Sequence, residues 1–81
     1  MEPQLSSPSA NKAPRVDLLT EVELFFIKLC CDEKGFSYKL IADHMGISVN
    51  TVHSHRRKVF AKLKVPTRIA LVLLALRLGL G

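Results

Sequence analysis

Residues 47–63 read ISVNTVHSHRRKVFAKL, and this stretch predicts a single amphipathic helix that begins directly after Ser48. A serine at that place can accept a hydrogen bond from the free N–H groups of the first helical turn. Val52, Val59 and Leu63 recur at helical spacing and form an apolar stripe that can face a core. The opposite side is polar or cationic and carries no acid. We therefore expect it to lie against a polyanion, in the major groove of DNA.

The charges of the chain are strongly segregated. The formal net charge is +5, yet all seven acids lie at or before Asp43, and the chain from His44 onward has seven Lys/Arg and no acid. The first part carries about −2, from five bases against seven acids, and the second carries +7. Such segregation predicts a basic surface patch, for which phosphate groups are the commonest partner. A charged face that is merely solvated is the alternative.

A second helix and a tight turn precede this stretch. Ser37 can cap a short helix at 38–45, and Gly46 suits the left-handed position that often ends a helix. Ala42 is small enough for another helix to cross close by, and Val52 follows the glycine by six residues, where it can pack back. Helix, glycine turn and helix at this spacing predict a helix-turn-helix.

The first helix begins at a capping box. Thr20 takes the N-cap and Glu23 lies three residues further on, while Leu19 and Leu24 can close a hydrophobic staple around them. We predict an all-α fold, a four-helix bundle with a central helix-turn-helix, whose helices span about 20–31, 38–45, 49–63 and 67–78.

The last helix is apolar nearly all round, and a domain this small cannot bury such a helix completely. Pro66 ends the preceding helix, and Thr67 can cap this one. One face can seal the core with Leu71, Val72, Ala75 and Leu78. A second face would be exposed in a monomer and consists of Ile69, Leu73, Leu76 and Leu80. Because an exposed apolar stripe marks a partner surface, we expect a homodimer through this helix. A solvated helix, or one that covers a domain outside this chain, is the alternative.

The composition of the remaining chain predicts a tail and a compartment. Residues 1–17 hold three of the four prolines and few apolar side chains, which is typical of a flexible tail or interdomain linker, so the domain is expected at 18–81. Adjacent Cys30 and Cys31 have no third cysteine with which to build a disulfide framework, and they suit a reducing compartment. Without a signal peptide or an apolar run of membrane-spanning length, we expect a soluble, cytoplasmic protein with no membrane partner.

Catalytic and metal-binding roles find little support in the sequence. His53 and His55 lie two residues apart on one helix, about 200° round from each other, so they cannot share one ion. Paired carboxylates, a nucleophile with its base and a glycine-rich phosphate loop are all missing. We therefore expect no enzyme, no cofactor and no metal site.

Four groups of residues resemble the LuxR/FixJ-type DNA-binding domain of bacteria over about residues 18–78. They are Leu19-Thr20-x-x-Glu23, Gly35-x-Ser37-x-Lys39-x-Ile41-Ala42, Ile47-Ser48-x-x-Thr51-Val52-x-x-His55 and Lys62-Leu63-x-Val65-x-x-Arg68. The chain departs from the family pattern at Val22, where an arginine is usual, at Leu40, where an acid is usual, and at His53, where lysine is frequent. The resemblance implies four helices, of which the second and third bind double-stranded DNA and the fourth often dimerises.

Many members of this family are output domains of two-component response regulators. The resemblance thus implies an upstream receiver or sensor domain and RNA polymerase as further partners, with residues 1–17 as the linker. The alternatives are a stand-alone small LuxR-type regulator, a sigma-factor-like helix-turn-helix, and a helical adaptor that binds only proteins. The Lys62-Leu63-x-Val65 turn disfavours the sigma-like reading, and the acid-free half disfavours the adaptor.

The resemblance and the helical spacing together predict the residues that bind DNA. By position, the family reads base edges at His53, Ser54 and Arg57, and the helical spacing adds Asn50 one turn away. Arg57 is the candidate for a bidentate contact to guanine. Phosphate contacts are expected from Lys39, Ser48, Thr51, His55, Lys58, Lys62 and Arg68, and from the N–H groups that begin the Ser37 helix. For His55 the alternative is a structural role at the helix seam, and for Thr51 it is the completion of the helix start.

Overall fold

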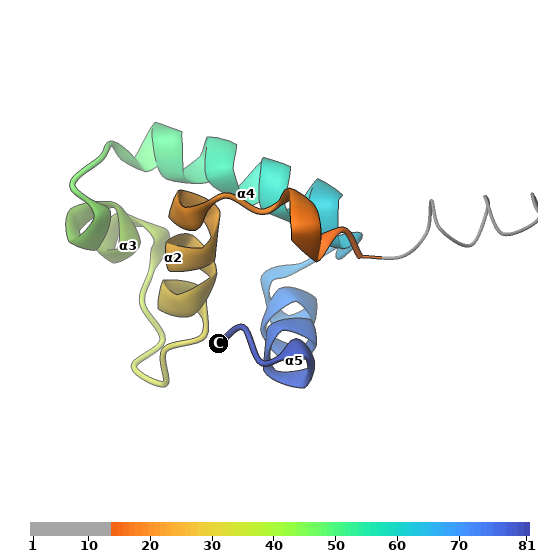
Figure 1. Cartoon of the computed structure of the whole chain (residues 1–81). Coiled ribbons are helices and arrows are strands. Elements are labelled where there is room, and N and C mark those ends of the chain that lie inside the picture. Colours follow the sequence, from red (N-terminus) through yellow and green to blue (C-terminus); the bar gives the residue numbers. More distant parts are fainter. Residues whose placement is uncertain (1–13) are drawn as a thin grey trace, which may run out of the picture.

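A computed structural model describes residues 14–81, so most of the expected tail at 1–17 lies outside the described residues. The helices are η1 (Val16–Leu18), α2 (Glu21–Cys30), α3 (Tyr38–Met45), α4 (Val49–Leu63) and α5 (Arg68–Leu78). In Figure 1, α4 runs across the domain, with α2 and α3 beneath one half of it and α5 beneath its other end. The described part contains helices and no strand, which confirms the predicted all-α fold with four main helices.

Side chains at the N-caps explain why each main helix begins where it does. Thr20 and Glu23 form the predicted capping box, since Thr20 N–H donates to Glu23 Oε1 (2.9 Å) and Glu23 N–H donates to Thr20 Oγ1 (3.1 Å). The other three caps also follow the prediction, with hydroxyls that accept a backbone hydrogen bond at Ser37, Ser48 and Thr67. The N-terminal residue of each of the four main helices was therefore predictable from its capping residue alone.

Left-handed residues end three of the helices. Gly46 (φ 69°) follows α3 and Gly79 (φ 75°) follows α5, where a glycine adopts this conformation without strain. After α4 the same position is taken by Lys64 (φ 58°), a residue with a Cβ. The turn at Gly46 is closed by a hydrogen bond from Ile47 N–H to the carbonyl of Ala42 (3.1 Å), and α4 begins two residues later. This is the predicted helix-turn-helix.

The core lies between the four main helices. Its fully buried members come from all four helices and include Phe26, Ile27, Ile41, Val52, Val59, Leu63, Leu71 and Ala75. Of the four residues of α5 predicted to seal the core, Leu71 and Ala75 are fully buried and Val72 is half-buried, but Leu78 is 43% exposed and was predicted wrongly.

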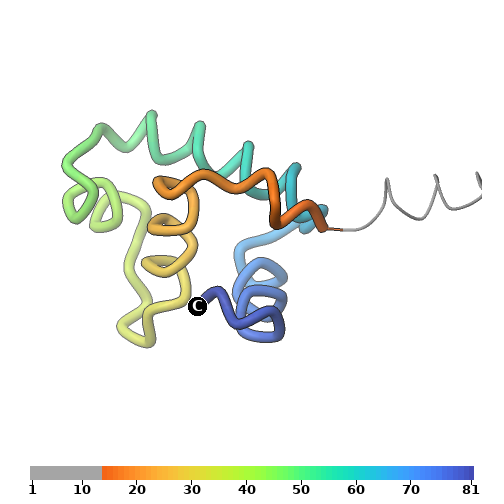
Figure 2. The backbone as a smooth tube through the Cα atoms, in the orientation of Figure 1, coloured from red at the N-terminus to blue at the C-terminus, as the bar shows by residue number. Residues whose placement is uncertain are grey.

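Leu80, and not Leu78, packs against the core at the end of the chain. Its N–H donates to the carbonyl of Ala75 (2.8 Å), and the left-handed turn at Gly79 brings its side chain back against the core. The tube in Figure 2 shows the C-terminus returning between α2 and α5. Leu80 therefore does not continue the exposed stripe of α5 in which it was predicted.

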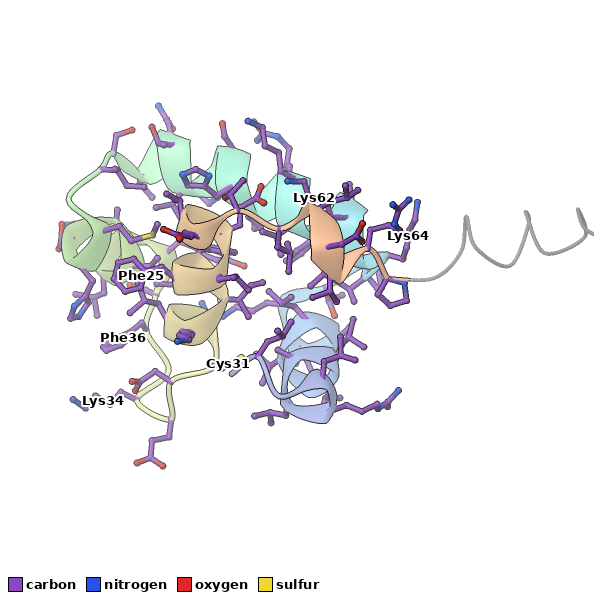
Figure 3. All side chains as sticks on the ribbon, viewed as in Figure 1. Phe25, Cys31, Lys34, Phe36, Lys62 and Lys64 are labelled. Atoms are coloured by element: carbon purple, nitrogen blue, oxygen red, sulfur yellow. The ribbon has the colours of Figure 1, made fainter. Side chains whose placement is uncertain are left out.

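The chain is already tied to the domain before the expected boundary at residue 18. Arg15 N–H donates to the carbonyl of Lys62 (2.9 Å), and the single turn η1 then crosses the end of α4. Figure 3 shows Lys62 and Lys64 at this end of α4, beside η1. With Arg15, Leu18 and Ala61 they line an open groove. None of the helices between residues 14 and 81 combines the length and hydropathy that crossing a bilayer requires.

Candidate nucleic-acid interface

The outer side of α4 presents a row of polar side chains. Asn50, Arg57 and Lys58 are exposed and Ser54 is half-buried, while Val52 and Val59 on the inner side are fully buried. Arg57 Nη2 donates to Ser54 Oγ (3.3 Å), which directs the guanidinium along the row. Seven residues of helix separate Asn50 from Arg57, or about 10 Å, which is the length of roughly three base-pair steps. The row therefore has the dimensions of a short reading surface.

The cations of this row are not neutralised by acids of the domain. Within residues 14–81 the ion pairs are Arg15–Asp17 (3.2 Å) and Lys62–Glu23 (2.6 Å), and neither involves Arg57 or Lys58. Lys39 on α3 is exposed as well, and His55 is half-buried on α4. The field of this surface is therefore positive and open to an anionic partner.

Ser48 and Thr51 form a hydroxyl pair at the start of α4. Ser48 Oγ accepts from Thr51 N–H (3.1 Å) and lies 2.9 Å from Thr51 Oγ1. Both residues are exposed. Because the contact between the two oxygens uses one hydroxyl hydrogen, the second hydroxyl can still donate to a phosphate oxygen. The pair can complete the helix start and contact DNA at the same time.

His53 is more enclosed than its place in the row suggests. Its imidazole meets the ring of Tyr38 edge-on, with centroids 5.3 Å apart and an interplanar angle of 68°. Nδ1 is buried and has no hydrogen-bond partner among the described residues, so Nε2 is the nitrogen through which His53 can reach a base.

Tyr38 and Arg56 are residues that the sequence reasoning missed. The Arg56 guanidinium lies 5.7 Å from the centroid of the Tyr38 ring and 5.8 Å from that of Phe60. The spacing of Arg56 and Phe60, four apart on one helix, signals the second contact. No local pattern signals Tyr38. Burial raises the pKa of Tyr38 above its ordinary value even though two guanidinium groups lie nearby, so the phenol stays neutral and its π face can attract cations.

Arg68, for which a phosphate contact was expected, is half-buried and makes contacts within the domain. Its guanidinium is 5.0 Å from the centroid of the Tyr38 ring, and Nη2 donates to the carbonyl of Cys30 (3.4 Å). These contacts join the first turn of α5 to α2 and α3. They give Arg68 a structural role that depends on residues far away in the sequence.

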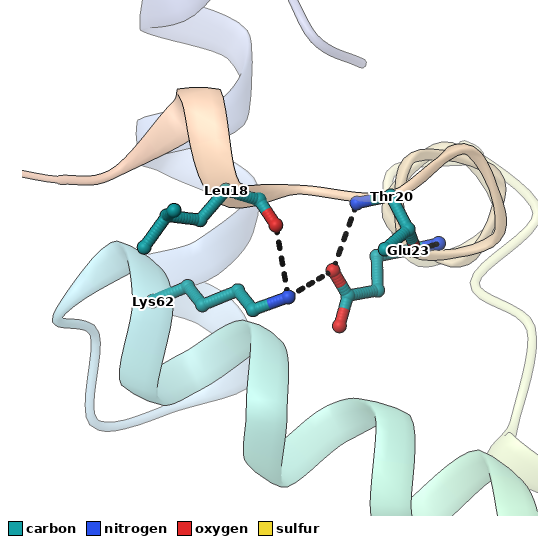
Figure 4. Close-up of polar contacts among 4 residues, drawn as sticks. All are labelled: Leu18, Thr20, Glu23 and Lys62. Carbon is teal, nitrogen blue, oxygen red and sulfur yellow. Dashed lines mark hydrogen bonds and ion pairs between the residues drawn. The ribbon is translucent and has the colours of Figure 1, made fainter.

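Lys62 is likewise occupied within the domain. Figure 4 shows its ammonium group between Glu23 Oε1 (2.6 Å) and the carbonyl of Leu18 (2.9 Å). Burial opposes the charge of the Glu23 carboxylate, but hydrogen bonds from Lys62 and Thr20 and the charge of Lys62 outweigh it, and the pKa of Glu23 is lowered. The ammonium group of Lys62, for which a phosphate contact was expected, is thus engaged in an internal ion pair.

The remaining face of α5 is exposed and apolar. Ile69, Leu73 and Leu76 are 74%, 59% and 60% exposed, respectively, and Arg77 is exposed near the end of the same helix. Core contacts cover Leu71 and Ala75 on the opposite side. Three large apolar side chains at this exposure on one helix form a surface that water solvates poorly.

The metal-ligating side chains and the thiols of the domain bear on the expectation of no metal site. Within residues 14–81 no three His, Cys, Asp or Glu side chains gather so that they could hold a metal ion. Cys30 and Cys31 are free thiols, and burial raises the pKa of Cys30 to about 11. A thiol of that pKa is protonated at neutral pH and is therefore a weak nucleophile.

The sequence profile of the bacterial regulatory proteins of the luxR family matches residues 18–75. The match begins at Leu18, the last residue of η1, and includes α2 and the whole helix-turn-helix. It ends at Ala75, within α5. No curated protein matches the chain.

Proposed function

Since the chain belongs to the luxR family of bacterial regulatory proteins, a non-enzymatic helix-turn-helix family that binds DNA, we propose that α4 reads a specific operator in the major groove. The observation that carries the proposal is the outer row of α4. Its cations Arg57 and Lys58 are exposed and form no ion pair with acids among the described residues, and the helix-turn-helix presents them on its outer side. A regulator of this kind acts on chromosomal DNA, so we place it in the cytoplasm.

Base reading is assigned to four side chains of α4. Arg57 is the strongest member, because its planar guanidinium can donate twice to O6 and N7 of guanine. Asn50 can pair with adenine in the same bidentate way. His53, through Nε2, and Ser54 can each donate or accept, so they tolerate more than one base.

Phosphate binding is assigned to the residues around this row. They are Lys39, Ser48, Thr51, His55 and Lys58, together with the N–H groups at the start of α3. Lys62 and Arg68 are left out of the set because they bond within the domain. Contacts of this kind position the helix and make its affinity depend on salt.

Two neighbouring cations of α4 provide the test of this division. The bound sequence is first selected from random duplexes, and each variant is then titrated against that duplex and a scrambled one. Arg57→Ala should weaken binding to the selected duplex by about 1–3 kcal/mol, with a smaller effect on the scrambled one. Lys58→Ala should weaken both to the same extent and reduce the salt dependence.

The result for the wild type also tests the function itself. A wild-type protein that binds the selected and the scrambled duplex equally well would contradict sequence-specific recognition. Equal behaviour of Arg57→Ala and Lys58→Ala would contradict only the assignment of Arg57 to a base.

We further propose that the protein acts as a homodimer through α5. The support is the exposed stripe of Ile69, Leu73 and Leu76, which a second copy of the same helix could cover symmetrically. Two copies of α4 would then contact two half-sites of one operator. Leu80 is left out of this interface because its side chain packs on the core of its own domain.

The domain is also proposed to be the output part of a two-component response regulator that contacts RNA polymerase. The support is the likeness to LuxR/FixJ-type domains, many of which serve that purpose. A stand-alone small regulator of the same type is the alternative. The gene sequence upstream in the same reading frame tests the proposal, since a response regulator would encode a receiver domain there.

A further inference from the structure

Building on the proposed reading of DNA by α4, we propose that Tyr38 is a positioning residue that determines specificity, because it holds the imidazole of His53 in the orientation that reads a base. Tyr38 is the first residue of α3 and does not belong to the outer row of α4. Its side chain would therefore act on the operator only through His53, across the seam of the helix-turn-helix.

The ring of Tyr38 is fixed by contacts with every other main helix. From α2, the fully buried Phe26 stacks on it with centroids 6.5 Å apart and an interplanar angle of 13°. From α4, the guanidinium of Arg56 lies 5.7 Å from its centroid, and from α5 that of Arg68 lies 5.0 Å away. A ring held from several directions can serve as a rigid wall for a further side chain.

His53 lies against this wall. It meets the ring edge-on, at 5.3 Å between centroids, and its Nδ1 is buried and without a hydrogen-bond partner among the described residues. Nε2 is the ring nitrogen that remains for an outside partner, so on this proposal the ring of Tyr38 selects which nitrogen the groove meets. If the ring were removed, the imidazole could rotate into the vacated space, and Nε2 would lose its fixed direction.

The test measures discrimination between bases at single positions. Each base pair of the duplex selected by the wild type is substituted in turn, and the affinity of the wild type and of His53→Ala is measured for every substituted duplex. The base pair at which substitution weakens binding by the wild type but not by His53→Ala is assigned to His53. Tyr38→Leu should lose discrimination at that pair by about fivefold or more and keep it at the pair assigned by Arg57→Ala. Tyr38→Phe keeps the ring and should behave as the wild type within about twofold. In the double variant, Tyr38→Leu should add no further loss to His53→Ala.

A matched control exists on the same segment. Phe36 packs on His44 with centroids 4.6 Å apart, so Phe36→Leu also removes an aromatic neighbour of a histidine, but of one outside α4. This variant should keep the discrimination of the wild type. Circular dichroism checks that each variant is folded. If Tyr38→Leu is not, Tyr38→Met replaces it, since a longer side chain without a flat ring fills more of the space.

Three outcomes would overturn the inference and leave DNA binding intact. In the first, Tyr38→Leu keeps discrimination at the pair of His53. In the second, it loses discrimination equally at the pair of Arg57, which would mean a general loosening of the domain. In the third, His53→Ala affects no base pair although the wild type prefers the selected duplex. A wild type without any preference would instead contradict the proposed function.

Discussion

Glu23 is the one buried charged residue within residues 14–81, and one of its oxygens serves two helices. Oε1 accepts from Thr20 N–H, which completes the start of α2, and from the ammonium group of Lys62 in the last turn of α4. A buried carboxylate is stable only when such partners compensate for its lost hydration. The pair therefore ties the start of α2 to the last turn of α4.

Replacing the charge of Glu23 should reveal this contribution and its dependence on pH. Glu23→Gln keeps the cap but loses the ion pair, so its free energy of unfolding at pH 7 should be lower by about 1–3 kcal/mol. Because folding lowers the pKa of Glu23, the advantage of the wild type is present above the ordinary value near 4.5 and is lost as the pH falls through the folded pKa. Urea unfolding at pH 7 and pH 3 measures both values, and a gap that stays constant between them would contradict the assignment.

The other half of the pair provides the control. Lys62→Met should destabilise the protein more than Glu23→Gln does, because it leaves the buried carboxylate without its counter-charge. Combining the two changes should recover part of that loss, as is expected of residues that interact directly.

At this scale, only the local half of each interaction could be predicted from the sequence. The capping role of Glu23 follows from a spacing of three residues, whereas Lys62 is 39 positions away. The same limit explains Arg68, whose partner Cys30 is 38 positions away. Arg68 and Lys62 were predicted to contact phosphate because the sequence gives their charge but does not identify the distant residues that they contact.

Among the elements, the helix ends differ in how well their residues suit the backbone. Gly46 and Lys64 both adopt the left-handed conformation, one after each helix of the helix-turn-helix. A Cβ on Gly46 would meet no atom within 4 Å, so a substitution there is opposed by backbone conformation alone. Lys64 has a Cβ and adopts a positive φ, so its backbone conformation is already unfavourable in the wild type.

Opposite substitutions at these two ends should have opposite effects. Gly46→Ala should lower the free energy of unfolding by about 1–2 kcal/mol, because an L side chain disfavours positive φ. Lys64→Gly should raise it by up to about 1 kcal/mol for the same reason. Thermal unfolding of the two variants and the wild type checks the order. The conformational explanation fails if Gly46→Ala is as stable as the wild type.

Helix starts were predictable because a cap and its N–H partner lie three residues apart. The faces of α5 were predicted less well. Its 3.6-residue period was extended through Gly79 to Leu80, although the left-handed turn at Gly79 ends the period and reverses the chain. Leu80 consequently packs on the core, and Leu78, the last helical residue, is left partly exposed. A periodicity argument holds only as far as the helix does.

For the whole molecule, the exposed stripe of α5 predicts the state of assembly. Leu73→Glu places a charge in the centre of the proposed interface, so analytical ultracentrifugation should show half the mass of the wild type. Binding to an operator with two half-sites should weaken by about tenfold or more, since the second domain is no longer held close to its half-site.

An exposed apolar residue outside α5 is the matched control for that charge. Val22→Glu, at a position 49% exposed on α2, adds the same group without touching the stripe, and it should leave the mass unchanged. A wild type that is already monomeric, both alone and on the operator, would contradict the proposed dimer.

The hydrogen bond between Arg15 N–H and the carbonyl of Lys62 has a mechanical consequence. It attaches the entering chain to the last turn of α4, close to the ion pair that fixes the same turn to α2. A pull on Arg15 would therefore act directly on the last turn of α4. The entering chain is thus attached to the helix that we propose reads DNA, at the end opposite Asn50.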